Sequence, residues 1–245
     1  MKIDQCSDLC QFFIDIVETI GQHSFQVKAN EPKLKFNEEN HSHEGRLKFV
    51  SAADSFQYRI NVEKSLTTLL KNYKKRFPRP ISLNDEQALV VPLIQMGMFN
   101  INADRDFNIY LYSNLPKNGQ LFLATSYFNM TEEYARELLD RKRADTKIKL
   151  LTASPEANGF YGSSGISQYV PAGYTENERE FVERAERKFS RDGQIQMFEY
   201  QRTSWTYHAK GLWLYDDEIH PDSSTPILTC VGSPNFGNEN RIESN

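Results

Sequence analysis

The C-terminal half of this chain alternates between short apolar runs and amphipathic segments. Five runs have the length and composition of buried strands: 120–128, 147–154, 195–200, 208–215 and 226–232. A helical pattern follows the first run, where Asn129 and Glu132 suggest a capping box before "TEEYARELLDRK". Another begins at Thr175, with Glu178 three residues later. Strands that alternate with helices predict an α/β fold with a sheet flanked by helices.

The N-terminal part has a different pattern. Apolar residues recur every three or four positions between Leu9 and Ile20, and Gly21 follows them, which predicts an amphipathic helix that ends there. A second helix is predicted from about Ala52 to Tyr73, before two prolines. The candidate core positions of these two helices are Leu9, Phe12, Phe13, Ile16, Val17, Ile20, Phe56, Ile60, Val62, Leu66, Leu69 and Leu70. Residues 26–48 are predicted to form a polar loop or an exposed hairpin.

Composition narrows the class of protein. A formal charge of −4 argues against a general nucleic-acid binder. The longest apolar run, 88–94, contains Pro92 and is too short to cross a bilayer. The first residues show no pattern typical of an import or secretion signal, so the sequence shows no recognisable targeting signal. Three cysteines give no disulfide framework; Cys6 and Cys10, one helical turn apart, are predicted to lie on a buried helix face.

The segment "HAK" at 208–210 carries the strongest chemical signal. In an extended strand, His208 and Lys210 project from the same face. Leu212 and Leu214 are predicted to point to the core. The next run delivers Gly232, Ser233 and Asn235 at a strand end, where Gly232 permits a tight turn. A lone H-x-K is frequent by chance, but G-S-x-N on a neighbouring strand makes a functional site the better interpretation.

These residue types suit a phosphoryl group. Lysine supplies a positive charge to the non-bridging oxygens, and the serine and asparagine donate hydrogen bonds where negative charge develops. Histidine can attack phosphorus or protonate a leaving group near neutral pH. Because Lys210 and these donors neutralise the charge, the site needs no metal or other cofactor.

Together, "HAK" and "GSPN" resemble the HxK…GSxN motif of the phospholipase D superfamily. Several longer segments are similar to the eukaryotic phosphatidylglycerophosphate synthases: "LATSYFNMT", "ASPEANGFYG", "VPAGYTENEREF", "WTYHAKGLWLY" and "GSPNFG". The resemblance covers most of 85–237, and 4–84 more loosely. It implies a phospholipase D-like αβα sandwich lobe with a mixed sheet at 85–245. Residues 1–84 would then be a helical and loop segment formed by the end of a first lobe and a connector.

Two departures from the family pattern stand out. Family members carry two histidine motifs, whereas none of the other four histidines here (His23, His41, His43 and His220) has a lysine two places later. After "GSPNFG" the family continues with a basic stretch and an acidic residue, whereas this chain has "NENRIESN". A smaller departure is Tyr215, which stands where the superfamily pattern has an aspartate. The interpretation is a partial synthase that carries the second motif only, inactive as a monomer. It would work by pairing two copies in a homodimer or by pairing with a lobe that carries the first motif.

The resemblance implies transfer of a phosphatidyl group from CDP-diacylglycerol to sn-glycerol 3-phosphate, with release of CMP, through a phosphohistidine intermediate. This is a step in phosphatidylglycerol and cardiolipin synthesis. His208 would act as the acid and base rather than as the nucleophile, although the symmetry of the motifs leaves this open. Lys210 and Asn235 would hold phosphate oxygens, and Ser233 would orient the site. The resemblance also implies a mitochondrial location, peripheral to the inner membrane.

Other features have both functional and structural interpretations. Asn129, Asn158 and Gly232 are predicted to bind substrate, or else to form caps and turns. The basic residues Lys71, Lys74, Lys75, Arg76 and Arg79 could meet anionic lipid, but solvated helix ends look the same. His41 and His43 are weak metal-ligand candidates in a polar loop, and Trp205 and Trp213 are predicted to lie in the core or a pocket wall. Two alternatives remain: a phospholipase D-type phosphodiesterase, and an inactive lobe that binds lipid or a partner.

Overall fold

The structure is a computed structural model that describes residues 6–23, 52–76, 88–140, 146–189, 194–219 and 225–236. The chain divides into two compact units, one ending at Ala103 and the other beginning at Asp104. The assignment of 1–84 to a first-lobe end and connector, and of 85–245 to a second lobe, stays a prediction. His41, His43, Arg79, His220 and the predicted loop at 26–48 lie outside the described residues.

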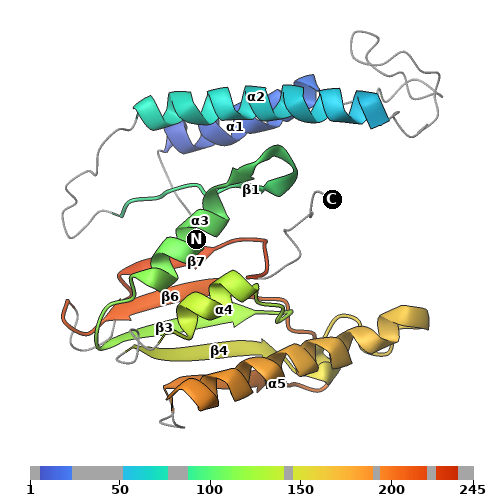
Figure 1. Cartoon of the computed structure of the whole chain (residues 1–245), viewed down its shortest axis with the longest axis vertical. Coiled ribbons are helices and arrows are strands. Elements are labelled where there is room, and N and C mark those ends of the chain that lie inside the picture. The colour runs from blue at the N-terminus through green and yellow to red at the C-terminus, as the bar shows by residue number, and fades with distance from the viewer. Residues whose placement is uncertain are drawn as a thin grey trace. The chain divides into compact units, whose positions relative to one another are not determined.

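Two long helices dominate the first unit, α1 (Ser7–Gln22) and α2 (Ala52–Arg76) (Figure 1). Phe12 meets Tyr73 edge to face at 5.0 Å, and the Tyr73 hydroxyl donates to Asp15 at 2.6 Å. At the ends of the helices Arg76 pairs with Asp8 at 2.8 Å. The same unit holds a two-stranded hairpin of β1 (Gln95–Met96) and β2 (Ile101–Asn102), joined by the short helix η1 (Gly97–Phe99).

Both helix predictions are confirmed, but the sequence predicted more buried core residues on these helices than the structure buries. The structure buries Phe12, Ile16, Val62 and Leu66, and the last two pack with Phe99 and Ile101. Four other predicted core residues are exposed: Phe13, Val17, Phe56 and Ile60. Gly21 continues α1 instead of ending it, Cys10 is exposed, and Cys6 is half-buried. The apolar stripe of α1 is therefore wider than the surface that buries it in this unit.

The second unit is built on a five-stranded mixed sheet in the order β5-β4-β3-β6-β7. Its strands are β3 (Gly119–Thr125), β4 (Lys147–Ala153), β5 (Ile195–Tyr200), β6 (Lys210–Asp216) and β7 (Leu228–Val231). The first three run parallel, whereas β6 is antiparallel to β3 and β7 is antiparallel to β6. All five strands fall on the apolar runs that predicted them, and the α/β fold class is confirmed.

The core lies on one face of this sheet. Register places Leu123 beside Leu150 of β4 and Leu212 of β6, so alternate residues of three strands form buried rows. Leu212 and Leu214 point into this core, as predicted. The helices that cover it are α3 (Ala103–Ser113), α4 (Glu132–Leu138) and α5 (Val170–Phe189) (Figure 1).

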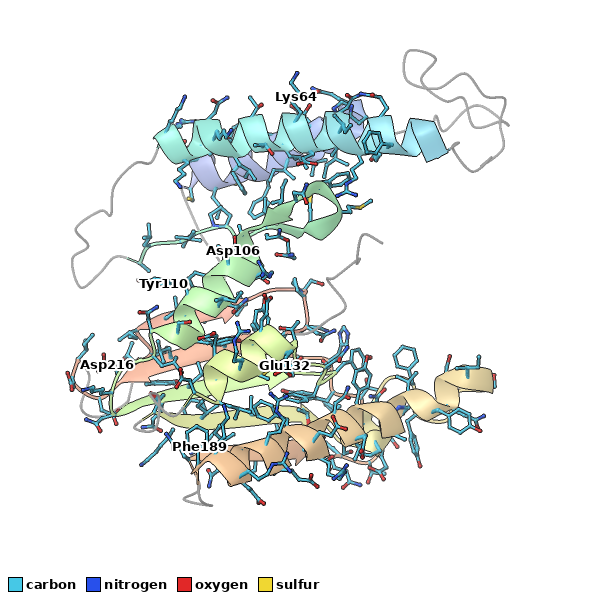
Figure 2. All side chains as sticks on the ribbon, in the orientation of Figure 1. Lys64, Asp106, Tyr110, Glu132, Phe189 and Asp216 are labelled. Atoms are coloured by element: carbon cyan, nitrogen blue, oxygen red, sulfur yellow. The ribbon has the colours of Figure 1, made fainter. Side chains whose placement is uncertain are left out.

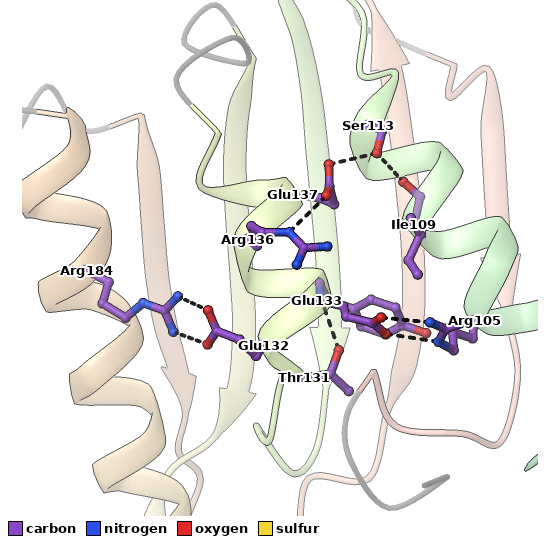
Figure 3. Close-up of polar contacts among 10 residues, drawn as sticks. Arg105, Ile109, Ser113, Thr131, Glu132, Glu133, Arg136, Glu137 and Arg184 are labelled. Carbon is purple, nitrogen blue, oxygen red and sulfur yellow. Dashed lines mark hydrogen bonds and ion pairs between the residues drawn. The ribbon is translucent and has the colours of Figure 1, made fainter.

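Ion pairs link the three covering helices to one another (Figure 3). Arg105 of α3 donates two hydrogen bonds to the carboxylate of Glu133 on α4, at 3.0 and 2.7 Å. Arg184 of α5 binds Glu132 in the same two-pronged way, at 2.8 and 2.7 Å. Paired hydrogen bonds fix the relative orientation of two groups as well as their distance. The two ion pairs thus fix the positions of α3, α4 and α5 relative to one another on this face of the sheet.

Two local predictions were wrong, and one helix was not predicted. The cap of α4 is Thr131, whose hydroxyl accepts from Tyr134 N at 3.2 Å, and not Asn129. The last long helix begins at Val170 instead of Thr175, because Pro171 is tolerated in a first turn, where no backbone N–H is needed. α3 was not predicted, since "ADRDFNIYLYS" carries acidic residues and a weak apolar period.

The other face of the sheet carries an open apolar hollow of about 510 Å³. Its lining includes Phe122, Lys149, Leu151, Phe198, Trp213 and Tyr215. Trp213 is thus a pocket-wall residue, as predicted, whereas Trp205 is 54% exposed and the prediction for it was wrong. Within the described ranges, no helix is both long enough and apolar enough to cross a bilayer.

Candidate active site

Topology brings the predicted site residues to one edge of the sheet. The parallel strands β3, β4 and β5 all end there, at Thr125, Ala153 and Tyr200. Lys210, the first residue of the antiparallel β6, pairs with Thr125. β7 ends at the same edge, because Val231 pairs with Gly211. The opposite edge is marked by Asp216, the last residue of β6 (Figure 2).

His208 and Lys210 lie in direct contact. Lys210 Nζ is 2.8 Å from His208 Nε2. An ammonium group has hydrogen-bond donors but no acceptor, so Lys210 can donate to Nε2 in the tautomer that leaves this ring nitrogen without a proton. His208 is exposed and Lys210 half-buried. The pair is therefore open to a ligand, and a bound phosphate would compete with Nε2 for the lysine proton.

The G-S-x-N turn continues from the end of β7. Gly232 and Ser233 are exposed, and Asn235 is half-buried. β7 neighbours β6, so the turn leaves the sheet beside the strand that carries Lys210. That these residues act together on one phosphate stays a prediction. None of them lines the hollow on the sheet face.

Tyr127, which the sequence analysis did not single out, is the aromatic neighbour of the pair. Its ring meets the His208 ring at 5.9 Å, nearly edge to face, and Lys210 Nζ lies 5.8 Å from its centroid. On its other side, Tyr127 stacks on Tyr174 at 5.3 Å. Gly159 makes room for its hydroxyl, since a Cβ there would lie 2.8 Å from Tyr127 Oη. Sequence analysis placed Tyr127 inside the predicted strand at 120–128, whereas β3 ends at Thr125, so no local signal singled this residue out.

The backbone around the site is fixed by buried polar groups. Ser126, which is 2% exposed, donates through Oγ to Ala209 O at 3.0 Å and thereby joins the end of β3 to the segment before Lys210. Tyr207 N donates to Ala157 O at 2.9 Å and joins the same segment to the loop after β4. The histidine is thus anchored on both sides although it precedes the first residue of β6.

The predicted substrate-binding asparagines make structural contacts. Asn158 is 3% exposed, and its Oδ1 accepts from Phe160 N at 2.9 Å in the turn after β4. Asn129 is half-buried, and its Oδ1 accepts from Asn177 Nδ2 at 3.4 Å. Both residues lie at the site edge, and their contact with substrate stays a prediction. Among the described residues, no three His, Cys, Asp or Glu side chains cluster as metal ligands would.

Comparisons with known proteins agree on one family. The chain is 34% identical over 250 residues to the probable CDP-diacylglycerol–glycerol-3-phosphate 3-phosphatidyltransferase of Dictyostelium discoideum; the match spans 96% of this chain and 40% of that protein. It is 32% identical over 248 residues to the human mitochondrial enzyme of that name, spanning 96% of this chain and 43% of that protein. No protein-family model matches.

Among solved structures, the phosphatidylserine synthase of Haemophilus influenzae is similar at a TM-score of 0.43 and 21% identity, over 63% of this chain and 36% of that one. The chain spans about two fifths of the length of the curated relatives just named. Over 96% of its own length, this chain is thus similar in sequence to part of the proteins named CDP-diacylglycerol–glycerol-3-phosphate 3-phosphatidyltransferase.

Proposed function

We propose that this chain carries one of the two histidine motifs of an active site that transfers a phosphatidyl group from CDP-diacylglycerol to sn-glycerol 3-phosphate. The observation that carries the proposal is the exposed His208–Lys210 pair, 2.8 Å apart, beside the strand that leads into Ser233 and Asn235. The names of the relatives supply the two substrates. The products would be phosphatidylglycerophosphate and CMP.

The chemistry has two steps. In the first, the nucleophilic histidine of the partner motif attacks the phosphatidyl phosphorus, and the bond from phosphorus to the bridging oxygen of CMP breaks. His208, protonated, gives its proton to that oxygen. In the second, His208 takes the proton from the 1-hydroxyl of glycerol 3-phosphate. The hydroxyl oxygen attacks phosphorus, the phosphorus–nitrogen bond breaks, and the first histidine is regenerated.

The other residues would stabilise the developing charge. Lys210 would place its ammonium on the non-bridging phosphate oxygens, and Asn235 would donate a hydrogen bond to them. Ser233 would orient the same turn. Tyr127 would hold the His208 ring and the Lys210 stem from the side. This chain supplies one imidazole of the required two, so the second would come from another copy across a twofold axis or from a lobe with the first motif.

The location follows the relatives. Those from several animals are named mitochondrial. We propose that this protein is a peripheral component of the mitochondrial inner membrane, because its lipid donor would require contact with a membrane. In α2, the residues Lys71, Lys74 and Lys75 would face anionic headgroups. Arg76 contributes less to such a patch, because Asp8 pairs with it.

The test is product analysis with the purified chain, CDP-diacylglycerol and labelled glycerol 3-phosphate. We expect phosphatidylglycerophosphate only from species heavier than a monomer, and a loss of about 1,000-fold or more in His208→Ala. His23→Ala is the control, because His23 lies on the first unit and contacts Ser65 instead. Phosphatidic acid as the product would indicate a phosphodiesterase. Equal turnover in wild type and His208→Ala would exclude a catalytic role for His208.

A further inference from the structure

An uncharged loop lies beside the candidate site. Charged residues make up 25% of the chain, yet the nineteen residues 157–175 contain no Asp, Glu, Lys or Arg. A surface loop of this length ordinarily carries several charges. The stretch runs from the end of β4 through the short helix η4 (Gly165–Tyr169) into the first turns of α5.

Large apolar side chains project from the uncharged loop into solvent. Ile166 is 88% exposed, Tyr169 69% and Tyr161 62%. Ile166 is the most exposed of the large hydrophobic residues that the structure describes. Single exposed apolar residues are common, but several on one uncharged segment mark an interaction surface.

The middle of this loop, at 161–169, lies away from the body of the unit. Gly162 and Gly165 have φ values of +73° and +68°, a conformation that favours glycine. A Cβ at either position would meet no atom within 4 Å. Figure 1 shows the start of α5 extending past the carboxyl ends of β3 and β4. The loop is thus a protrusion rather than the wall of a groove.

The uncharged loop is also joined directly to the candidate site. Its first residue, Ala157, accepts a hydrogen bond from Tyr207 N, one position before His208. Phe160 packs on the ring of Tyr127 at 5.8 Å, and Tyr174 stacks on the same ring at 5.3 Å. The ring that touches His208 is therefore held by both ends of the loop.

Trp205, on the segment that leads to His208, is an exposed aromatic residue with a cationic partner. Trp205 is 54% exposed, and the guanidinium of Arg202 lies 4.0 Å from its ring centroid. Tyrosine and tryptophan favour the headgroup level of a bilayer, where the ring is partly buried and the polar atom stays hydrated. Arginine there can bind lipid phosphate. Lys210 lies at the same edge of the sheet, so Arg202 and Lys210 both suit the anionic phosphate groups at a bilayer surface.

We propose that the uncharged loop, with Trp205, inserts into the interfacial region of a lipid bilayer and presents the headgroup of a membrane lipid to His208 and Lys210. This rests on the proposed function only in naming that lipid as the donor substrate. A bilayer suits a protruding tip that carries isoleucine and tyrosine without charge. It also explains why the surface adjoins a phosphate site, because the phosphate of a lipid lies at the depth where the rings would stop.

The test is co-sedimentation of the whole chain with phosphatidylcholine vesicles, with or without phosphatidylglycerol, in the absence of substrates. We expect Ile166→Ser and Tyr169→Ser each to lower the partition coefficient about tenfold, equivalent to about 1.4 kcal/mol. Tyr110→Ser is the matched control, because Tyr110 on α3 is also 69% exposed (Figure 2) and should leave binding unchanged. Circular dichroism of each variant establishes that it is folded.

A second measurement reports insertion itself. The chain has two tryptophans, so Trp213→Phe leaves Trp205 as the single reporter. Brominated phosphatidylcholine should quench its emission, and Ile166→Ser should weaken that quenching. Unchanged binding in the Ile166→Ser, Tyr169→Ser double variant would overturn the inference. Binding that needs phosphatidylglycerol and disappears in high salt would also overturn the inference. A third contrary result would be a loop that a second copy of the chain covers in solution without vesicles.

The two proposals fail separately. Vesicle binding that depends on Ile166 and Tyr169, together with equal turnover in wild type and His208→Ala, overturns the proposed function and leaves the bilayer contact intact. If product forms and vesicle binding is unchanged by substitution of Ile166 and Tyr169, the bilayer contact is overturned and the proposed function is not.

Discussion

Glu178 on α5 is a carboxyl group that we expect to stay protonated at neutral pH. Its side chain is only 6% exposed. Its neighbours are Thr152 of β4 and Glu199 of β5, which are register partners in the sheet. Burial raises the pKa of Glu178 to about 8; the Glu199 carboxyl adds to the increase, and the Thr152 hydroxyl opposes it.

The sign of the effect on stability follows from the raised pKa. Below about pH 4.5, the carboxyl is protonated in both the folded and the unfolded chain and costs nothing. As the pH rises from 4.5 to 8, the unfolded chain releases this proton while the folded chain retains it. The free energy of unfolding therefore falls over this window, and Glu178→Gln should abolish that fall.

The magnitude can be bounded. A tenfold difference in proton affinity corresponds to about 1.4 kcal/mol, so the difference between 4.5 and 8 would cost about 5 kcal/mol at most. Because Glu199 is exposed and water screens its charge, we expect Glu178→Gln to be more stable than wild type by about 2 kcal/mol at pH 8. At pH 4.5 the two should be equal.

Urea unfolding at pH 4.5, 6 and 8, followed by tryptophan fluorescence, measures this. Trp205 and Trp213 both lie in the unit that begins at Asp104, so their emission reports on the unit that contains Glu178. Glu180→Gln, an exposed position on the same helix, is the control and should follow the wild-type curve. A Glu178→Gln variant that keeps the wild-type dependence on pH would refute the reasoning.

Three further predictions concern the second unit. Leu150→Ala, at a position 0% exposed in the centre of the core, should lower the free energy of unfolding by about 3 kcal/mol in the same assay. Burial raises the pKa of the Cys230 thiol to about 11, so at pH 8 it should react with a disulfide reagent about 100-fold more slowly than exposed Cys10. Gly159→Ala should displace the Tyr127 ring and shift the His208 imidazole resonances in NMR spectra, whereas Gly173→Ala, which meets no atom within 4 Å, should not.

The sequence predicted the strands well because each is a short apolar run whose alternate residues need burial. The pairing of those strands depends on contacts that local pattern does not encode. β3 lies in the middle of the sheet, next to both β4 and β6, although about ninety residues separate it from β6 along the chain. Capping signals were less reliable: Thr175 and Glu178 look like a helix start, but Glu178 is instead a buried residue in the third turn of α5.

Helical periodicity overstated the core for a related physical reason. A three-to-four spacing shows that a helix has an apolar face but not how much of that face a neighbour covers. Phe12 and Ile16 are buried, and Phe12 packs against Tyr73 of α2, whereas Val17 on the same pattern is 69% exposed. The missed helix α3 is the converse case. Its fully buried residues are Asn108, Leu111 and Tyr112, all in its second half, and these are too few positions to produce a clear period.

The candidate site shows the same division between local pattern and topology. Alternation alone placed His208 and Lys210 together, and this needed only two residues of extended chain. The neighbouring turn at Ser233 required that β7 pair with β6, which their adjacency in sequence made predictable. Tyr127 arrives from the end of β3, and its contact with His208 follows only once β3 is known to pair with β6. A sequence motif therefore identifies the reacting groups. The residues that position those groups lie on other strands, and they can be identified only when the topology shows which strands end at the same edge of the sheet.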